Sequence, residues 1–208
     1  NARYVKDFVP PKNEDWIRLT THNRMAQTYN EQQLAALKTT EMSFMAEIRR
    51  NFPESSYPAD EHLVLKEGAQ VMFIKNDPNP GKEYYNGKIG TVEGVTWDDD
   101  RDERLIVVHC KEDDSTIYVP QLTWENTKYV IDAETKEIRE EVDGTFRQYP
   151  LRLAWAITVH KSQGLTFDKA IIDVQRAFTH GQTYVALSRC RTLEGLVLSA
   201  PLPQQAII

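Results

Sequence analysis

A run of phosphate-binding side-chain types occupies residues 158–164, where the sequence reads Thr-Val-His-Lys-Ser-Gln-Gly. Its polar members include Thr158, His160, Lys161 and Gln163, and the next acidic residue along the chain is Asp168. Hydroxyl, imidazole, ammonium and amide groups are those with which proteins hold phosphate oxygens. The run therefore predicts an anion-binding site, most simply for phosphate. The alternative is a solvated helix end with Lys161 near the negative end of the helix dipole.

The residues before this run predict a helix that would position it. Pro150 suits a helix start, because the first N–H groups of a helix have no intrahelical partner. Apolar or small residues within 151–159 recur at i, i+3, i+4, i+7 and i+8, the spacing of one buried helical stripe. Gly164 is a natural C-terminal stop. We therefore expect a packed helix from Pro150 to Gly164 whose last turn carries the polar run.

The chain has 208 residues, a net charge of −6 and 40% hydrophobic residues, which fits a globular protein with a real core. Cys110 and Cys190 lie far apart without metal-ligand spacing, which predicts no metal site and a reducing, cytoplasmic setting. No apolar run reaches the length of a membrane span, and no signal peptide is visible. Residues 151–208 carry six Lys/Arg against three Asp/Glu, a charge of +3, so the rest carries −9. The polar run thus lies in the basic part of an acidic chain.

The first third of the chain has α/β character. Residues 1–15 predict a connector, and 16–20 predict a short strand. Thr21, His22 and Asn23 follow as cap-type residues, and 24–37 predict a helix. A polar turn at the carboxyl end of a strand is where α/β folds place ligand contacts. His22 and Asn23 are therefore candidate ligand residues, with the alternative that Thr21 only caps the helix and Asn23 is solvated.

The middle of the chain predicts short antiparallel strands. A short helix is expected within residues 42–48, before Pro53. Strands are then expected near 69–74, 84–95, 105–108, 117–119 and 122–131, with an Asn-Gly turn at 86–87 and an acidic hairpin tip at 98–103. Five or six short strands separated by turns fit a small antiparallel barrel.

After Pro150 the α/β pattern returns. Beyond the expected helix, residues 169–174 predict a buried strand, 181–191 a helix and 195–199 a closing strand. The α/β segments on either side of the barrel are expected to share one parallel sheet, with the barrel inserted between them. The expected division is a connector (1–15), a first α/β part (16–65), the inserted barrel (66–149) and a second α/β part (150–208).

Two motifs in the last quarter carry a family resemblance. The run 158–164, followed after about twenty residues by Tyr-Val-Ala-Leu-Ser-Arg-Cys-Arg at 184–191, resembles motifs V and VI of superfamily 1 helicases, most of all the RecD/PIF branch. Residues 68–73 and 86–90 are similar to the SH3-like insertion of that branch, and 21–26 with 29–30 more weakly resemble motif IV. The resemblance implies a RecA-like second motor domain, equivalent to the C-terminal domain of UvrD-like helicases, interrupted by an SH3-like barrel.

The resemblance also implies roles for matching residues in ATP-driven 5′–3′ movement on DNA. Arg189 falls on the catalytic arginine that reaches the ATP γ-phosphate, and Gln163 and Gly164 lie on the nucleotide side. The implied contacts to the backbone of single-stranded DNA are His22, Asn23, Thr158, His160 and Lys161. The UvrD-like branch has a glutamate where this chain has Thr166, so a ribose contact is not expected.

The sequence contains no Gly-x-x-x-x-Gly-Lys-Ser/Thr phosphate loop, and Asp173 is a lone acid in an expected strand. We therefore expect the chain to need an N-terminal P-loop motor domain, which would supply the Mg²⁺ ligands, and to be inactive alone. Its expected cofactors are ATP and Mg²⁺, and its expected partner is single-stranded DNA. The rival hypothesis is a non-enzymatic binding module with an SH3-like barrel on an α/β scaffold.

Overall fold

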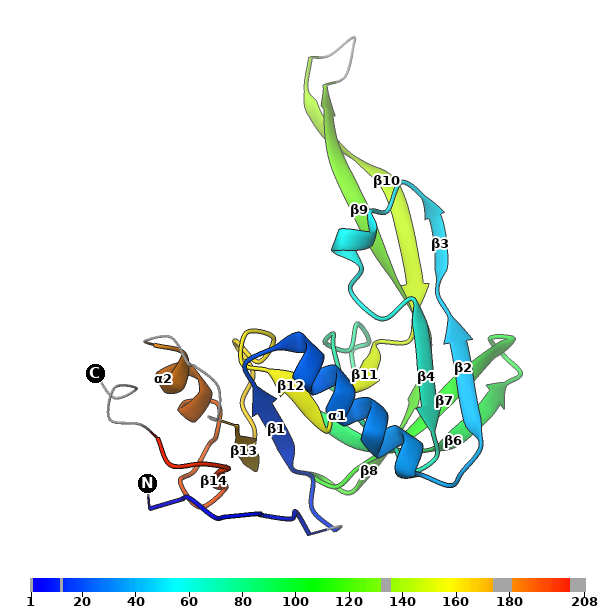
Figure 1. The fold of residues 1–208 in the computed structure, drawn as a ribbon. Coiled ribbons are helices and arrows are strands. Elements are labelled where there is room, and N and C mark those ends of the chain that lie inside the picture. The colour runs from blue at the N-terminus through cyan, green and yellow to red at the C-terminus, as the bar shows by residue number, and fades with distance from the viewer. Residues whose placement is uncertain (1, 12, 132–135, 174–180, 203–208) are drawn as a thin grey trace.

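The computed structural model describes residues 2–11, 13–131, 136–173 and 181–202, and it confirms the predicted parallel sheet (Figure 1). The sheet has the strand order β12 (Ala156–Thr158), β1 (Ile17–Thr20), β13 (Ala170–Ile172) and β14 (Leu196–Leu198). All of its pairings are parallel, so the carboxyl ends of the strands share one edge. β1 precedes the antiparallel strands in sequence and the other three follow all of them, so the chain leaves this sheet and later returns to it.

Two helices and the N-terminal segment flank the parallel sheet. α1 (Asn23–Ala36) confirms the helix predicted for 24–37 and buries Ala26 and Leu34. α2 (Gln182–Leu187) is shorter than the helix predicted for 181–191, because the chain turns from Ser188 onward. The N-terminal segment runs beside β14, where the Val5 N–H donates to the Leu198 carbonyl at 3.2 Å.

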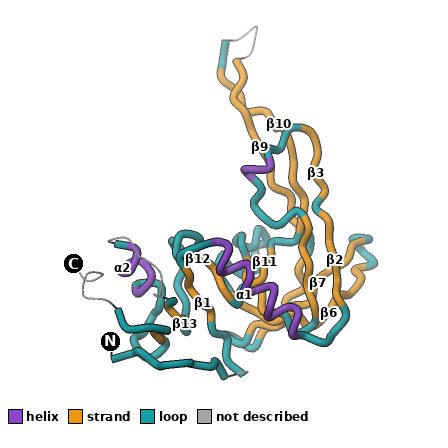
Figure 2. Tube along the Cα trace, in the orientation of Figure 1, coloured by secondary structure: helices purple, strands orange, loops and turns teal. Residues whose placement is uncertain are grey.

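The antiparallel part contains a five-stranded sheet covered by a two-stranded antiparallel sheet. The five-stranded sheet has the order β11 (Leu151–Leu153), β5 (Gln70–Phe73), β6 (Ile89–Asp98), β7 (Glu103–Cys110) and β8 (Ser115–Val119). The two-stranded sheet pairs β2 (Glu41–Met45) with β4 (His62–Lys66). Phe44, Leu63 and Leu65 of the two-stranded sheet share one buried core with the five-stranded sheet. Figure 2 shows that strands dominate this half of the molecule.

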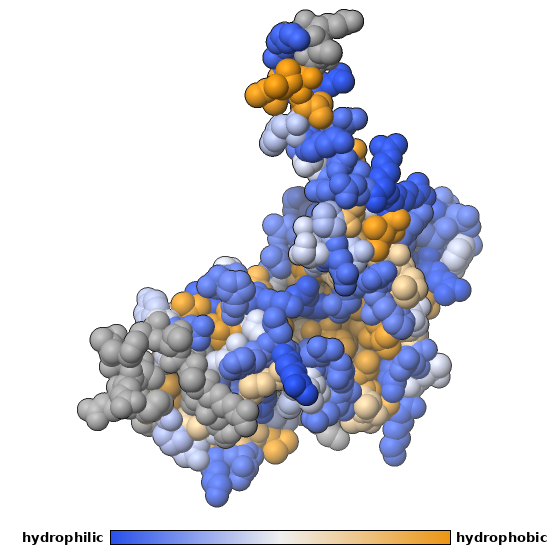
Figure 3. Space-filling model, turned by 45° about the horizontal axis from the view of Figure 1, so that its top comes forward, coloured by the Kyte–Doolittle hydropathy of each residue, from blue (hydrophilic) through white to orange (hydrophobic). Residues whose placement is uncertain are grey.

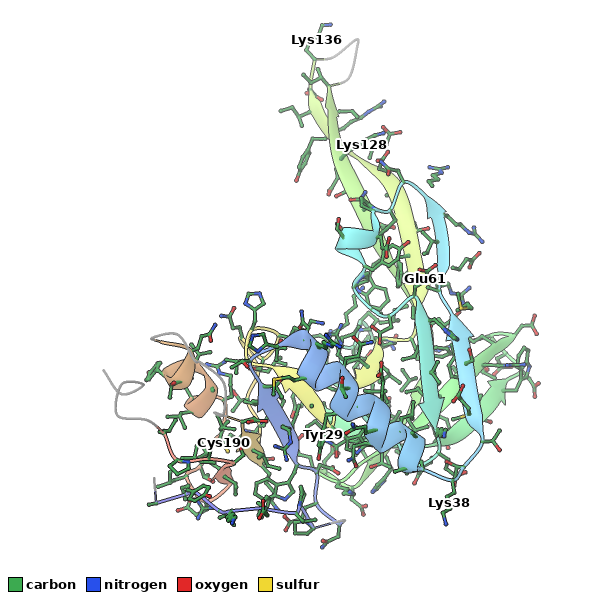
Figure 4. All side chains as sticks on the ribbon, in the orientation of Figure 1. Tyr29, Lys38, Glu61, Lys128, Lys136 and Cys190 are labelled. Carbon is green, nitrogen blue, oxygen red and sulfur yellow. The ribbon has the colours of Figure 1, made fainter. Side chains whose placement is uncertain are left out.

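A long arm of strands projects from the antiparallel part (Figure 1). It consists of β9 (Leu122–Ile131) and β10 (Ile138–Gln148), with β3 (Glu47–Arg50) against the lower half of β10 and the 3-10 helix η1 (Glu54–Ser56) nearby. Lys128 and Lys136 mark its upper half in Figure 4. Ile131 and Ile138 pair across the strands while 69% and 72% exposed, and Figure 3 shows this apolar patch near the tip of a mostly hydrophilic arm.

Three expectations about these regions were wrong. Residues 150–164 form β11, β12 and a series of turns, not a helix. Ala156–Val159 is buried throughout, and periodicity cannot distinguish a buried strand from a buried helix over so short a run. Residues 42–48 lie in β2 and β3, where Phe44 is buried between exposed neighbours, a two-residue alternation. The five expected strands do not all belong to one sheet, because 122–131 lies outside the five-stranded sheet and builds the arm.

Candidate functional site

The carboxyl edge of the parallel sheet brings together two segments that are 138 residues apart in the sequence. Thr20 and Thr158 are paired in register at the ends of β1 and β12, and both are almost fully buried. The Val159 N–H donates to the Thr20 carbonyl at 2.9 Å, and this hydrogen bond joins the two segments just beyond the last residue pair of the strands. His22, Asn23, His160 and Lys161 follow these strand ends and are exposed. The structure thus gathers the sequence-predicted DNA contacts at one edge.

The turn after β12 is built by its own side chains. The Lys161 N–H donates to the Thr158 hydroxyl at 3.2 Å, and the Ser162 hydroxyl donates to the Val159 carbonyl at 2.7 Å. Gly164 adopts a φ of +79°, a left-handed conformation that favours glycine. Thr158 therefore shapes the turn that presents His160 and Lys161, while Gln163 and Gly164 are exposed at its end.

The segment after β1 is also organised by polar contacts. The Thr20 hydroxyl donates to the His22 carbonyl at 3.3 Å, and the Thr21 hydroxyl is 2.6 Å from His22 Nδ1. α1 begins at Asn23 without a side-chain cap from His22, so the first N–H groups of the helix face this edge without such a partner. Thr21 is thus not a helix cap through its own side chain, and the edge combines exposed amide, imidazole and ammonium groups.

Arg189 lies behind the polar turn and is partly buried. Its Nη1 donates to the Leu165 carbonyl and its Nε to the Val185 carbonyl, both at 3.1 Å, and its Nη2 donates to the Ser188 hydroxyl at 3.0 Å. Leu165 directly follows Gly164, so the guanidinium lies beside the segment that carries Gln163 and Gly164. These bonds use three of the five N–H groups of the guanidinium, which leaves two for an anion.

Asp173 and Arg18 form a second polar contact near the same edge. Asp173 follows β13 and does not lie inside it, which corrects the expected strand position. Its carboxylate accepts from the Ser199 hydroxyl at 3.2 Å and lies 3.7 Å from an Arg18 guanidinium nitrogen. Arg18 also stacks over the Tyr29 ring at 4.9 Å. These contacts tie β1, β13 and α1 together beneath the edge.

Asn30 of α1 holds the outer side of β12, a role that its place in the segment resembling motif IV did not indicate. Its Nδ2 donates to the Ala156 carbonyl at 2.8 Å, and its Oδ1 accepts from the Ala156 N–H at 2.8 Å. The side chain therefore replaces a neighbouring strand at the free side of β12. Sequence reasoning could not find this role, because it depends on a register between α1 and a strand more than 120 residues away.

We predict that Asn30→Ala lowers the free energy of unfolding by about 2–3 kcal/mol, because it leaves the N–H and C=O of Ala156 without a partner. Gln27→Ala is the matched control, since Gln27 is an exposed residue of the same helix that bonds only Glu31. Urea unfolding followed by tryptophan fluorescence measures both. Equal stability of the two variants would contradict the role assigned to Asn30.

Among the residues that the structure describes, no three His, Cys, Asp or Glu side chains converge in a way that could hold a metal ion. No helix in the described ranges has the length and apolar character needed to span a membrane.

The fold and the sheet edge match one class of protein, the superfamily 1 DNA helicases. No protein-family model matches the chain. Within that class, the chain shows strong homology to helicases of the Pif1 family over most of its length. An ATP-dependent DNA helicase Pif1 of Psychrobacter is 36% identical over 222 residues, which cover 87% of this chain and 33% of that protein.

Two solved structures extend the similarity to three dimensions. Bacteroides Pif1 in complex with ADP-AlF4 has a TM-score of 0.86 and 40% identity, covering all of this chain and 45% of that one. Bacteroides Pif1 bound to single-stranded DNA has a TM-score of 0.73 and 41% identity, with the same coverage. The chain spans only 33% to 44% of the length of three curated relatives, so it corresponds to part of such a protein.

Proposed function

We propose that this chain is the second motor domain of an ATP-dependent DNA helicase that moves 5′ to 3′ on single-stranded DNA. The observation that carries the proposal is the register of Thr20 with Thr158, which places the segments after β1 and β12 on one sheet edge. Structures of the related Bacteroides protein have been solved with single-stranded DNA and with ADP-AlF4. They support the two halves of the proposal, DNA binding and nucleotide binding.

The DNA-binding half of the proposal rests on polar side chains at the sheet edge. We assign the DNA-backbone site to His22, Asn23, Thr158, His160 and Lys161, with Thr158 buried beneath the other four. Contacts to phosphate and sugar position a protein without reading sequence, which suits a motor that must move along any strand. Thr158 contributes by shaping the turn, and the other four side chains are exposed to solvent, where DNA can reach them.

The nucleotide half of the proposal assigns Arg189 to the γ-phosphate, with Gln163 and Gly164 beside it. Its support is the contact between the guanidinium and the carbonyl of Leu165, which directly follows these residues. Bound ATP would supply the phosphoryl group, and a fixed guanidinium stabilises the charge that spreads over the transferred oxygens. The Mg²⁺ ligands and the phosphate loop belong, in this proposal, to an N-terminal P-loop domain, without which the chain is inactive.

The proposed division keeps 1–15 as a connector, 16–65 and 150–208 as the RecA-like domain, and 66–149 as an SH3-like insertion. The parallel sheet supports it, since β1 comes from the first motor segment and β12–β14 from the second. The five-stranded sheet would be the SH3-like module. β2 and β4 pack on its core although they belong, except for Lys66, to the first motor segment.

The proposal predicts that the chain binds labelled oligo-dT and that His160→Ala weakens this binding roughly fivefold, the effect of one lost hydrogen bond. His109→Ala is the control, because His109 lies on β7 beside Asp114 and outside the sheet edge. Fluorescence anisotropy measures binding, and phosphate release with ATP in the same samples should stay at the buffer level. DNA-stimulated phosphate release by the chain alone, or equal binding by both variants, would overturn this assignment.

The rival hypothesis of a non-enzymatic SH3-like and α/β binding module makes a different prediction for the protein that contains this chain. A scaffold has no use for a guanidinium beside a polar turn, so it predicts unchanged ATP hydrolysis when Arg189 is replaced.

A further inference from the structure

A cavity of about 520 Å³ lies where α1, β12 and the residues leading into β4 meet. Its wall includes Asn23, Thr158 and Lys161 of the proposed DNA edge, together with Arg152 of β11. Glu61, which also lines the cavity, is labelled near the foot of the arm in Figure 4. The cavity therefore continues the sheet edge toward the antiparallel part of the molecule.

The Arg152 guanidinium is largely enclosed but poorly satisfied. Its Nη2 donates to the Pro58 carbonyl at 3.2 Å, whereas its Nε is buried without a hydrogen-bond partner. It forms no ion pair with any residue in the described ranges. Burial lowers the pKa of Arg152. A cation withdrawn from water without a carboxylate at ion-pair distance or full hydrogen bonding is unfavourable, and native structures rarely retain one without a reason.

Lys161 adds a second positive charge to the same wall. Burial and the nearby Arg152 charge lower the pKa of its ammonium group, and the negative charge of Asp60 opposes this effect. No carboxylate of the described residues lies within salt-bridge distance of either cation. Two like charges thus face one cavity with Asp60 as their main electrostatic counterweight, an arrangement that an entering anion would stabilise.

We propose that Arg152 and Lys161 together bind one phosphodiester group of the single-stranded DNA, as a site that continues the strand's path from the sheet edge into the cavity. This inference rests on the proposed function. A guanidinium and an ammonium are the side chains that suit phosphate oxygens best. Glu31, Asp60 and Glu61 also line the cavity, so anion binding is restricted to the part of its wall that carries the two cations.

The test compares Arg152→Gln with Arg49→Gln in the full chain. Arg49 is exposed on β3 and pairs with Glu47, so its replacement removes the same charge outside the cavity. Oligo-dT affinity is measured by anisotropy over a range of salt concentrations. Arg152→Gln should weaken binding about tenfold and reduce the slope of log affinity against log salt by roughly 0.7, the value for one phosphate contact on a single strand. Arg49→Gln should change neither quantity.

The contacted phosphate is located with oligo-dT strands that each carry one methylphosphonate linkage, which lacks the phosphate charge, at a different position. One linkage should weaken wild-type binding, and the loss at that same linkage should be smaller in Arg152→Gln, which keeps only Lys161 there. The melting temperature of Arg152→Gln separates a binding role of Arg152 from a structural one. Because the variant removes a buried cation that lacks an ion pair, its melting temperature should be equal to or higher than that of the wild type. If Arg152→Gln fails to fold, Arg152→Met, which keeps an apolar stem of similar length and removes the charge, carries the same comparison.

The outcomes distinguish this inference from the proposed function. Oligo-dT binding that is equally strong in Arg152→Gln and Arg49→Gln overturns the phosphodiester site and leaves the proposed function standing. No binding by the wild-type chain overturns both. A third outcome is that oligo-dT does not bind, while inorganic phosphate raises the melting temperature of the wild type but not that of Arg152→Gln. This result would identify a site for free phosphate and overturn the DNA assignment.

Discussion

Replacing Arg189 with alanine in the protein that contains this chain is expected to lower DNA-stimulated ATP hydrolysis by roughly 10³–10⁵-fold, the range for arginine fingers in other phosphoryl-transfer enzymes. The loss follows from the charge that develops on the transferred phosphoryl oxygens, which only a positioned cation can stabilise. DNA binding should be largely retained, because the guanidinium lies behind the turn and bonds carbonyls of Leu165 and Val185, not the exposed edge.

Arg189→Lys and Arg49→Ala sharpen this experiment. Lysine keeps the charge but cannot span the Leu165 carbonyl and a phosphate with one planar fork, so we expect most of the rate loss to remain. Arg49→Ala, on the exposed β3 strand, should leave the rate unchanged. Phosphate release and oligo-dT anisotropy are measured on the same preparations. An unchanged rate in Arg189→Ala would favour the non-enzymatic scaffold, and lost DNA binding would show that the side chain has another role.

Local sequence signals were sufficient for the elements that surround the site. The strand and helix of residues 16–37 follow from a short apolar run, a polar turn and a helical stripe, all within one stretch of chain. β13 and β14 are short runs buried on both faces, as expected for a parallel sheet. The motif resemblance then identified the polar turn, which the structure places on the same edge as His22.

The errors arose where the outcome depends on distant partners. The residues before the polar turn carry a helix-like spacing, but β1 on one side and Asn30 on the other hold them extended. The arm was missed because β3 pairs with β10 across more than 90 residues, with Arg50 opposite Gly144. Arg152 and Lys161 were likewise not recognised as a pair, since nine residues and a change of sheet separate them.

Of the stability changes predicted here, Gly195→Ala is expected to cause the largest loss, because the backbone packs closely around Gly195. Gly195 is buried at the entry to β14, and a Cβ there would lie 1.8 Å from the Asp168 carbonyl oxygen. Its own carbonyl accepts from the Ala170 N–H at 2.9 Å, the first bond between this segment and β13. The methyl group can be accommodated only if the two strands separate at their start. We expect a loss of at least about 4 kcal/mol, comparable with the whole stability of many domains.

Gly81→Ala is the matched control for this prediction. Gly81 lies in a turn, and the nearest atom to an added Cβ is the flexible Glu83 side chain at 3.9 Å. Its replacement should change the stability by less than about 0.5 kcal/mol. Urea unfolding monitored by tryptophan fluorescence compares the two variants, and similar midpoints would contradict the close approach of Gly195 to Asp168.

The same substitution connects the fold to the proposed chemistry. The Arg189 carbonyl accepts from the Phe167 N–H at 2.7 Å, and the Arg191 N–H donates to the Phe167 carbonyl at 3.0 Å. The segment that carries the guanidinium is therefore held by the backbone of Phe167, the residue directly before Asp168. Displacing Asp168 would move that anchor. In the protein that contains this chain, any folded Gly195→Ala variant should therefore also lose ATP hydrolysis, while the exposed edge at β1 and β12 still binds DNA.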